Sequence, residues 1–133
     1  PNDAPTLSRS LQRLYNLGVR PDWWKLPSMT DVAWQAVGET IEREDVYCRG
    51  VVLLGLDAPM DEMKRGFQAA AQHACCKGFT VGRTLFASAS RDWLAGRIDD
   101  ASLVERVAQN YAELIKAWRQ LRQPQSLAHT EEA

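Results

Sequence analysis

A lysine near the end of one apolar run and a Gly-Arg pair after another are the residue types in this sequence best suited to chemistry. Lys25 lies near the end of Asp22–Leu26, which the pattern predicts to be a β-strand. Gly82 and Arg83 come at the end of a second predicted strand, Cys76–Val81. A neutral amine attacks a carbonyl to form a Schiff base, and arginine binds phosphate through paired hydrogen bonds. Together these residues suit a carbonyl compound that carries a phosphate.

The neighbours of Lys25 decide which way its side chain faces. Alternate side chains of a strand point to opposite faces, so Trp24 and Leu26 share one face and Lys25 lies on the other. If the tryptophan and leucine pack against helices, the lysine points into a sheet interior or barrel, where desolvation lowers its pKa. The alternative is a lysine that reaches solvent at a strand end or pairs with Asp22.

Three residues form the candidate phosphate site. Glycine lets a phosphate approach the backbone at Gly82, Arg83 supplies charge, and the start of a helix adds partial positive charge. Gly55 follows the run Gly50–Leu54 and can line the same site. The alternative for Gly82 and Arg83 is a glycine turn followed by a surface arginine.

Other candidates are weaker by position or number. Lys77 and Arg49 precede or begin their strands, whereas active sites of parallel α/β proteins lie at the carboxyl ends, so we interpret both as structural. The two histidines, His73 and His129, are scattered, and we predict neither a metal nor a cofactor. The three cysteines form no CxxC motif and are expected to be reduced thiols.

Composition bounds the class of protein. The chain has 133 residues, is 45% hydrophobic and 25% charged, and carries a formal net charge of -1. These values indicate a soluble globular domain and give no signal for nucleic acid or a membrane surface. No apolar run reaches membrane-spanning length. The three cysteines, expected to be reduced thiols, are typical of a cytoplasmic protein, which is the location we expect.

Helical and strand periodicities alternate along the chain. The predicted strands are Asp22–Leu26, Gly50–Leu54 and Cys76–Val81. The predicted helices are Ser8–Leu17, one capped by Thr30 or Asp31, one opened by Pro59 at its first position, Ser88–Ala95, and one from Asp99 or Asp100 to about Leu121. Residues 123–133 lack periodicity, which predicts a disordered tail after a domain over 1–122.

This order predicts an α/β fold with three parallel strands and right-handed crossovers. Three strands do not close a barrel. The chain is therefore either a small three-stranded unit or a piece of a larger sheet, and a sequence that starts with a helix favours the piece.

Three long strings carry a resemblance to a known family. LGVRPDWWKLP, YCRGVVLLGLDAP and KGFTVGRTLF with DWLAGRIDD span roughly residues 10–120. They resemble the C-terminal domain of bifunctional 5-dehydro-2-deoxygluconokinase/5-dehydro-2-deoxyphosphogluconate aldolases of bacterial myo-inositol catabolism. That resemblance implies the C-terminal part of a TIM (β/α)8 barrel, with strands six, seven and eight.

A more distant likeness is to tagatose-bisphosphate aldolases. By that likeness Lys25 falls on the Schiff-base position and Gly82-Arg83 on the phosphate position. Pro27 stands where an acidic residue is common in both groups. The resemblance further implies a phosphorylated keto-sugar acid as substrate, a fused sugar kinase domain and the remainder of the barrel as partners, and a homo-oligomer.

Two other classes remain open. The chain can be a non-catalytic fragment or accessory domain that stabilises or oligomerises a sugar kinase, because an opened barrel exposes sheet edges and apolar surface. A free-standing nucleotide-binding module ranks last, since the sequence lacks a phosphate loop.

Overall fold

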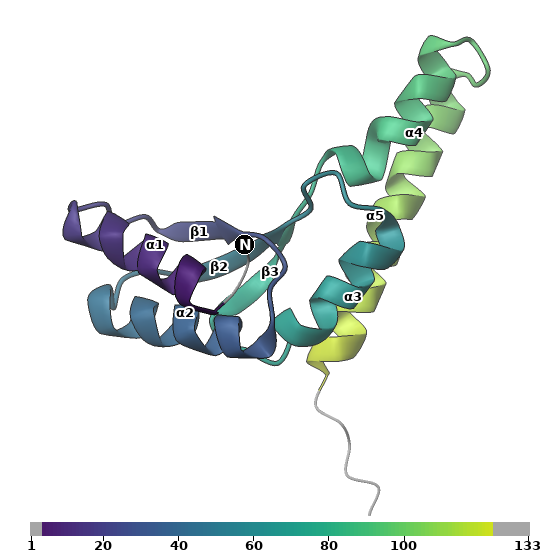
Figure 1. The fold of residues 1–133 in the computed structure, drawn as a ribbon. Coiled ribbons are helices and arrows are strands. Elements are labelled where there is room, and N and C mark those ends of the chain that lie inside the picture. The colour runs from purple at the N-terminus through teal and green to yellow at the C-terminus, as the bar shows by residue number, and fades with distance from the viewer. Residues whose placement is uncertain (1–3, 124–133) are drawn as a thin grey trace, which may run out of the picture.

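The computed structural model describes residues 4–123 and shows three strands alternating with helices (Figure 1). The elements are α1 (Ala4–Asn16), β1 (Trp23–Leu26), α2 (Asp31–Glu44), β2 (Gly50–Leu54), α3 (Met60–Ala70), β3 (Cys76–Thr80), α4 (Arg83–Leu94) and α5 (Asp100–Arg122). Residues 124–133, predicted to be a disordered tail, lie outside the described residues, and Gln123 is the C-cap of α5.

The strands form one open parallel sheet in the order β1-β2-β3. Lys25 pairs with Val52, and Val52 pairs in turn with Gly78, so these three residues lie in one row across the sheet. The predicted α/β class with three adjacent parallel strands is confirmed, and an open sheet of this kind is compatible with part of a barrel.

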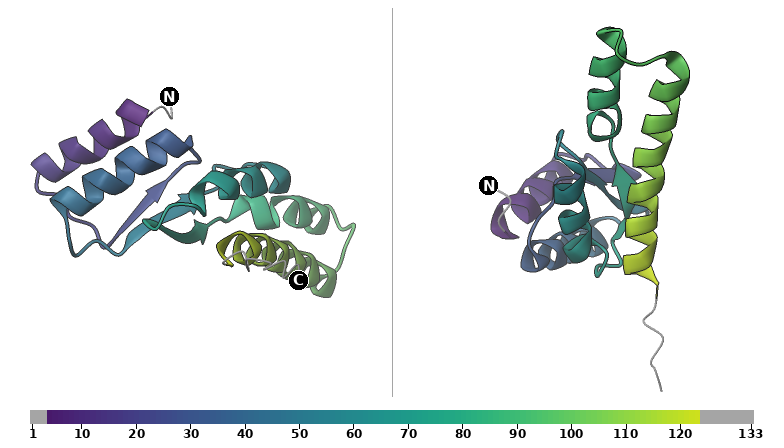
Figure 2. Two further views of the ribbon diagram at one scale, coloured as in Figure 1. Left: turned by 90° about the horizontal axis from the view of Figure 1, so that it is seen from below. Right: turned by 90° about the vertical axis from the view of Figure 1, so that its right-hand side faces the viewer.

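The two faces of the sheet differ in what covers them. Leu26, Val51, Leu53 and Cys76 are buried in one core with residues of α1, α2, α3 and α5. Figure 2 shows α1 and α2 side by side along this side of the sheet. We call the other side of the sheet the open face. The alternating strand residues on this face are Trp23, Lys25, Val52, Leu54, Gly78 and Thr80.

Local capping explains where the helices begin and end. After α1, Gly18 has φ +83°, and the amides of Gly18 and Val19 donate to the carbonyls of Tyr15 and Leu14. These bonds form a Schellman motif, in which a left-handed glycine closes the helix. The Thr30 hydroxyl accepts from the Ala33 amide at the start of α2, as expected for an N-cap.

Three predicted helix starts were wrong. The helix predicted over Ser8–Leu17 begins four residues earlier, at Ala4. Pro59 is the N-cap of α3 and not its first helical residue. The helix predicted over Ser88–Ala95 begins five residues earlier, at Arg83, with Gly82 as its N-cap. Serine favours N-cap positions in general, but Ser88 is an exposed residue inside α4.

α4 and the first part of α5 form a helical hairpin that extends away from the sheet (Figure 1). We call residues 83–111 the arm. The remainder of α5 packs on α3, where Phe67 and Trp118 meet edge-to-face at 5.3 Å and Lys64 pairs with Glu113. These contacts fix the arm to the body at its base.

The three cysteines are free thiols. Burial raises the pKa of Cys76 to about 11 and also raises the pKa of Cys75. Both groups are therefore thiols and not nucleophilic thiolates at neutral pH.

Candidate functional site

The four residues singled out in the sequence line one hollow at the carboxyl ends of the strands. The hollow has a volume of about 420 Å³ and is bordered by β1, the ends of β2 and β3, and the start of α4. Its lining residues are Lys25, Leu54, Gly55, Leu56, Asp57, Thr80, Val81, Gly82, Arg83, Thr84 and Phe86. Parallel α/β proteins bind ligands at this end of the sheet because the loops there converge.

Lys25 enters the hollow from the open face. Its neighbour Trp24 is turned to the helices, where the indole N–H donates to the Tyr15 hydroxyl at 2.8 Å. Leu26 is buried on the same side. Lys25 itself is exposed. Asp22, which the sequence offered as a partner for Lys25, lies 4.0 Å from Arg49. The strand thus orients the lysine toward the hollow, but no element among residues 4–123 shields it from solvent.

Arg83 is the first residue of α4 and lies across the hollow from β1. Its Nη1 atom is 3.3 Å from Oδ2 of Asp57, and its side chain is 65% exposed. The N-terminus of a helix carries partial positive charge, which adds to the charge of the guanidinium. This end of the hollow is the one suited to an anion.

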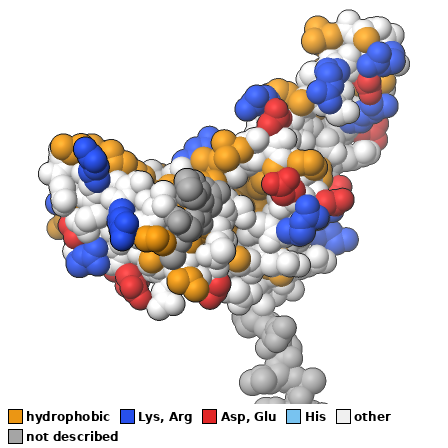
Figure 3. Space-filling model, in the orientation of Figure 1, with side chains coloured by type: hydrophobic (Ala, Val, Ile, Leu, Met, Phe, Trp, Pro, Cys, Tyr) orange, Lys and Arg blue, Asp and Glu red, His pale blue; other side chains and the backbone are white. Residues whose placement is uncertain are grey.

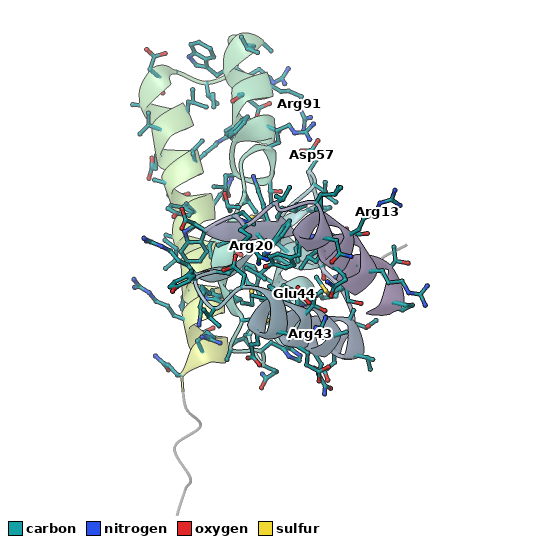
Figure 4. All side chains as sticks on the ribbon, turned by 90° about the vertical axis from the view of Figure 1, so that its left-hand side faces the viewer. Arg13, Arg20, Arg43, Glu44, Asp57 and Arg91 are labelled. Atoms are coloured by element: carbon teal, nitrogen blue, oxygen red, sulfur yellow. The ribbon has the colours of Figure 1, made fainter. Side chains whose placement is uncertain are left out.

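Asp57 is a site residue that the sequence patterns did not indicate. It follows β2 in a tight turn in which the Ala58 amide donates to the Gly55 carbonyl at 2.9 Å. Leu56 and Asp57 have φ values of 48° and 67°, a left-handed conformation that costs a non-glycine residue about 1 kcal/mol or more. Figure 4 shows Asp57 at the outer end of this turn, beside α4. The sequence signal that could have indicated Asp57 is an acidic residue shortly after the end of a predicted strand.

Gly55 is required by close packing at the floor of the hollow. A Cβ atom there would lie 2.9 Å from Val81 Cγ1 and 3.0 Å from Thr84 Oγ1. The buried Thr84 hydroxyl has no hydrogen-bond partner among the described residues. The absence of a side chain at Gly55 therefore brings the turn after β2 into contact with the start of α4.

A second hollow of about 540 Å³ lies on the other side of the turn after β2. Residues 54–57 line both hollows, and Pro27, Glu62 and Gly66 line only the second. A methyl group on Gly66 would meet Ser28 Oγ at 2.9 Å. The turn is thus a thin wall between two cavities.

The remaining candidates lie elsewhere. Lys77 packs beside Gly50 at the amino ends of the strands, away from the hollow. Arg49 lies at the same end of the sheet, directly before β2. His73 contacts Asp31 at 2.7 Å and stacks on Trp34. Within residues 4–123, no three His, Cys, Asp or Glu side chains are grouped to hold a metal ion. No helix in this range is long and apolar enough to cross a membrane.

Comparisons with known proteins identify a family but not an activity. No curated protein and no solved structure matches the chain significantly. One family model, described as an uncharacterized protein conserved in bacteria (DUF2090), matches residues 1–122. Because this match covers nearly all of the 133 residues, the chain belongs to the DUF2090 family.

Proposed function

We propose that this chain is the catalytic C-terminal part of a class I aldolase barrel. The substrate is 5-dehydro-2-deoxy-D-gluconate 6-phosphate, and the products are dihydroxyacetone phosphate and malonate semialdehyde. The observation that carries the proposal is the convergence of Lys25, Gly55, Gly82 and Arg83 on one hollow at the carboxyl ends of the strands. An amine and an anion-binding corner in the same hollow suit a ketone that carries a phosphate.

Lys25 has the role of nucleophile. Its neutral amine attacks the ketone carbon, and loss of water gives an iminium ion. When the carbon–carbon bond breaks, its electron pair moves onto the iminium to form an enamine, and the neighbouring hydroxyl loses its proton to a base as it becomes the aldehyde. Protonation of the enamine and hydrolysis then release dihydroxyacetone phosphate and the free lysine.

Arg83, Gly82 and Gly55 have the role of phosphate binders. The guanidinium forms charge-assisted hydrogen bonds, and the N-terminus of α4 adds its partial charge. The phosphate group competes with Asp57 for Arg83, because the two carry charge of the same sign. Asp57 is therefore assigned to the phosphate end of the hollow and not to proton transfer at the carbonyl.

Completion of the barrel provides the missing features of the site. Lys25 is exposed here, whereas an amine must lose solvent to become neutral near physiological pH. Elements placed over the open face would remove that solvent and supply the base. We expect them, and a fused sugar kinase domain, from the longer protein implied by the resemblance.

A non-catalytic accessory domain is the second candidate. It is favoured by the open face itself, on which Trp23 is 44% exposed and Lys25 is also exposed. Under this alternative the open face binds a kinase domain, and Lys25 has no chemical role.

The test compares two lysine variants in the longest natural polypeptide that contains this chain. Lys25→Arg keeps the positive charge but cannot act as a neutral amine, so we expect cleavage to fall by about 10³-fold or more. Lys77→Arg is the control, because Lys77 lies at the other end of the sheet, and it should retain activity within about twofold. Equal activity of Lys25→Arg and the unsubstituted protein would rule out the aldolase mechanism.

A further inference from the structure

The arm carries an apolar groove between its two helices. The groove has a volume of about 450 Å³, and its lining residues are Leu85, Phe86, Ser90, Leu103, Val104, Val107, Ala108 and Tyr111. Three of the hydrophobic ones are substantially exposed: Phe86 by 43%, Val104 by 67% and Tyr111 by 49%. Figure 3 shows hydrophobic side chains on the arm and on the surface where the arm joins the rest of the molecule. Apolar surface gathered in one groove indicates a binding site.

The arm is held in shape by its own polar contacts. Near the tip, one carboxylate oxygen of Asp92 accepts from Arg97 and the other accepts from Arg106, both at 2.8 Å. The Trp93 indole donates to Asp100, and the Asn110 amide donates to the Leu85 carbonyl. These bonds link α4 to α5 along their length. A surface ordered in this way before binding loses little conformational entropy when it binds.

The charges of the arm are balanced. Residues 83–111 contain four arginines and four acidic residues and no lysine or histidine, so their formal charge is zero. The eight are Arg83, Arg91, Arg97, Arg106, Asp92, Asp99, Asp100 and Glu105. A polyanion or a strongly basic partner would find no charge of the opposite sign in excess, whereas two identical arms would not repel each other.

We propose that the groove binds the same groove of a second copy of this chain. Two helical hairpins that meet through their apolar faces form a four-helix bundle, which buries the apolar groove that each hairpin exposes on its own. Such a contact is isologous, so each exposed residue of one copy faces the equivalent surface of the other. Balanced charge and preformed shape fit this occupant better than an acidic or basic partner.

The size of the groove predicts the strength of the contact. α4 has 12 residues and is therefore about 18 Å long, and two helices side by side are about 20 Å wide. The face that results is smaller than the roughly 800 Å² per partner of a stable interface. We therefore expect a dissociation constant in the micromolar range.

The interface would border the candidate site. Phe86 lines both the groove and the hollow that contains Lys25. Its ring also lies 3.3 Å from the position of a Cβ atom on Gly82. A second copy seated in the groove would restrict Phe86 and with it one wall of the hollow.

Sedimentation velocity of the full chain up to about 100 μM tests the proposal. The chain should sediment increasingly as a dimer, and Val104→Glu, which puts a charge in the groove, should weaken dimerisation at least tenfold. Val32→Glu is a matched control, because Val32 is also a helical valine and is 65% exposed. If Val104→Glu does not fold, Ala108→Glu replaces it, since Ala108 is an exposed residue of the same groove.

Three results would overturn the inference. They are a chain that sediments as a monomer throughout, a Val104→Glu variant that dimerises as strongly as the unsubstituted chain, and a Val32→Glu variant that loses dimerisation to the same extent. Retained dimerisation in Val104→Glu would point to contact through another surface, such as the open face. None of these results depends on aldolase activity, so they are distinct from failure of the proposed function.

Discussion

Arg83 and Asp57 are the charged pair at the phosphate end of the hollow, and a second pair in the chain resembles them. Arg49 lies 4.0 Å from Asp22, and its side chain is 68% exposed, compared with 65% for Arg83. Both pairs join an arginine to an aspartate on the surface. Of the two, the Arg83–Asp57 pair lies at the carboxyl ends of the strands, so the other is an internal control.

Arg83→Gln should weaken the binding of inorganic phosphate to the full chain by about tenfold or more. Hydrogen bonds to charged groups contribute about 1.5–3 kcal/mol, and this substitution removes the charged donor. Arg49→Gln should change the affinity less than about twofold. Isothermal titration calorimetry with inorganic phosphate provides both values. Similar losses in the two variants would mean that phosphate binds by net charge and not in the hollow.

Asp57→Asn should strengthen phosphate binding by a few-fold. The substitution removes a carboxylate that competes for Arg83 and repels the phosphate, and exposed charge interactions of this kind are worth up to about 1 kcal/mol. Asp22→Asn should leave binding unchanged. Titrations followed by ³¹P NMR measure the difference. Weaker binding in Asp57→Asn would show instead that Asp57 holds Arg83 in its binding position.

Residue type and strand ends led to four of the lining residues, whereas Asp57, an acid three residues after the end of β2, was passed over. Lys25, Gly55, Gly82 and Arg83 could be chosen because each lies near the carboxyl end of a predicted strand. Asp57 enters the hollow through a left-handed turn that includes Leu56 at φ 48°. Leucine rarely adopts this conformation, so residue type gave no indication of the turn.

At the scale of elements, periodicity predicted the sheet better than the arm. The strands are short apolar runs whose alternation is set by one buried face, and their predicted bounds lie within about one residue of the observed ones. The start of α4 was missed for two reasons. Gly82 is a weak capping signal, and Leu85 and Phe86 line the apolar groove, so they do not form the buried stripe that helical periodicity detects. Sequence alone did not show that α4 and α5 extend beyond the sheet.

Gly55→Ala should destabilise the chain by about 1–3 kcal/mol, because the new methyl group would overlap Val81 and Thr84 across the packed floor of the hollow. Gly78→Ala is the control. A Cβ atom at Gly78 would meet nothing within 4 Å, and alanine restricts the unfolded chain more than glycine does. Urea unfolding followed by circular dichroism should show a loss in the first variant and no loss in the second. Equal stabilities would mean that the turn after β2 can move away from α4 at no cost.

At the scale of the whole molecule, the covered face and the open face have different roles. The buried core joins four helices to one face of the sheet and accounts for the folding of the chain. The open face carries Lys25 with Val52 and Gly78 in one row, and no described element covers Lys25. We interpret this face as the interior of a barrel that other segments complete.

Reductive trapping tests the central proposal most directly. The longest natural polypeptide that contains this chain is incubated with dihydroxyacetone phosphate and sodium borohydride, which reduces an iminium to a stable secondary amine. Peptide mass spectrometry should then locate the adduct on Lys25, and Lys25→Arg should remove it while Lys77→Arg does not. An adduct on Lys77, no adduct at all, or cleavage that requires a chelatable metal would contradict the class I aldolase mechanism.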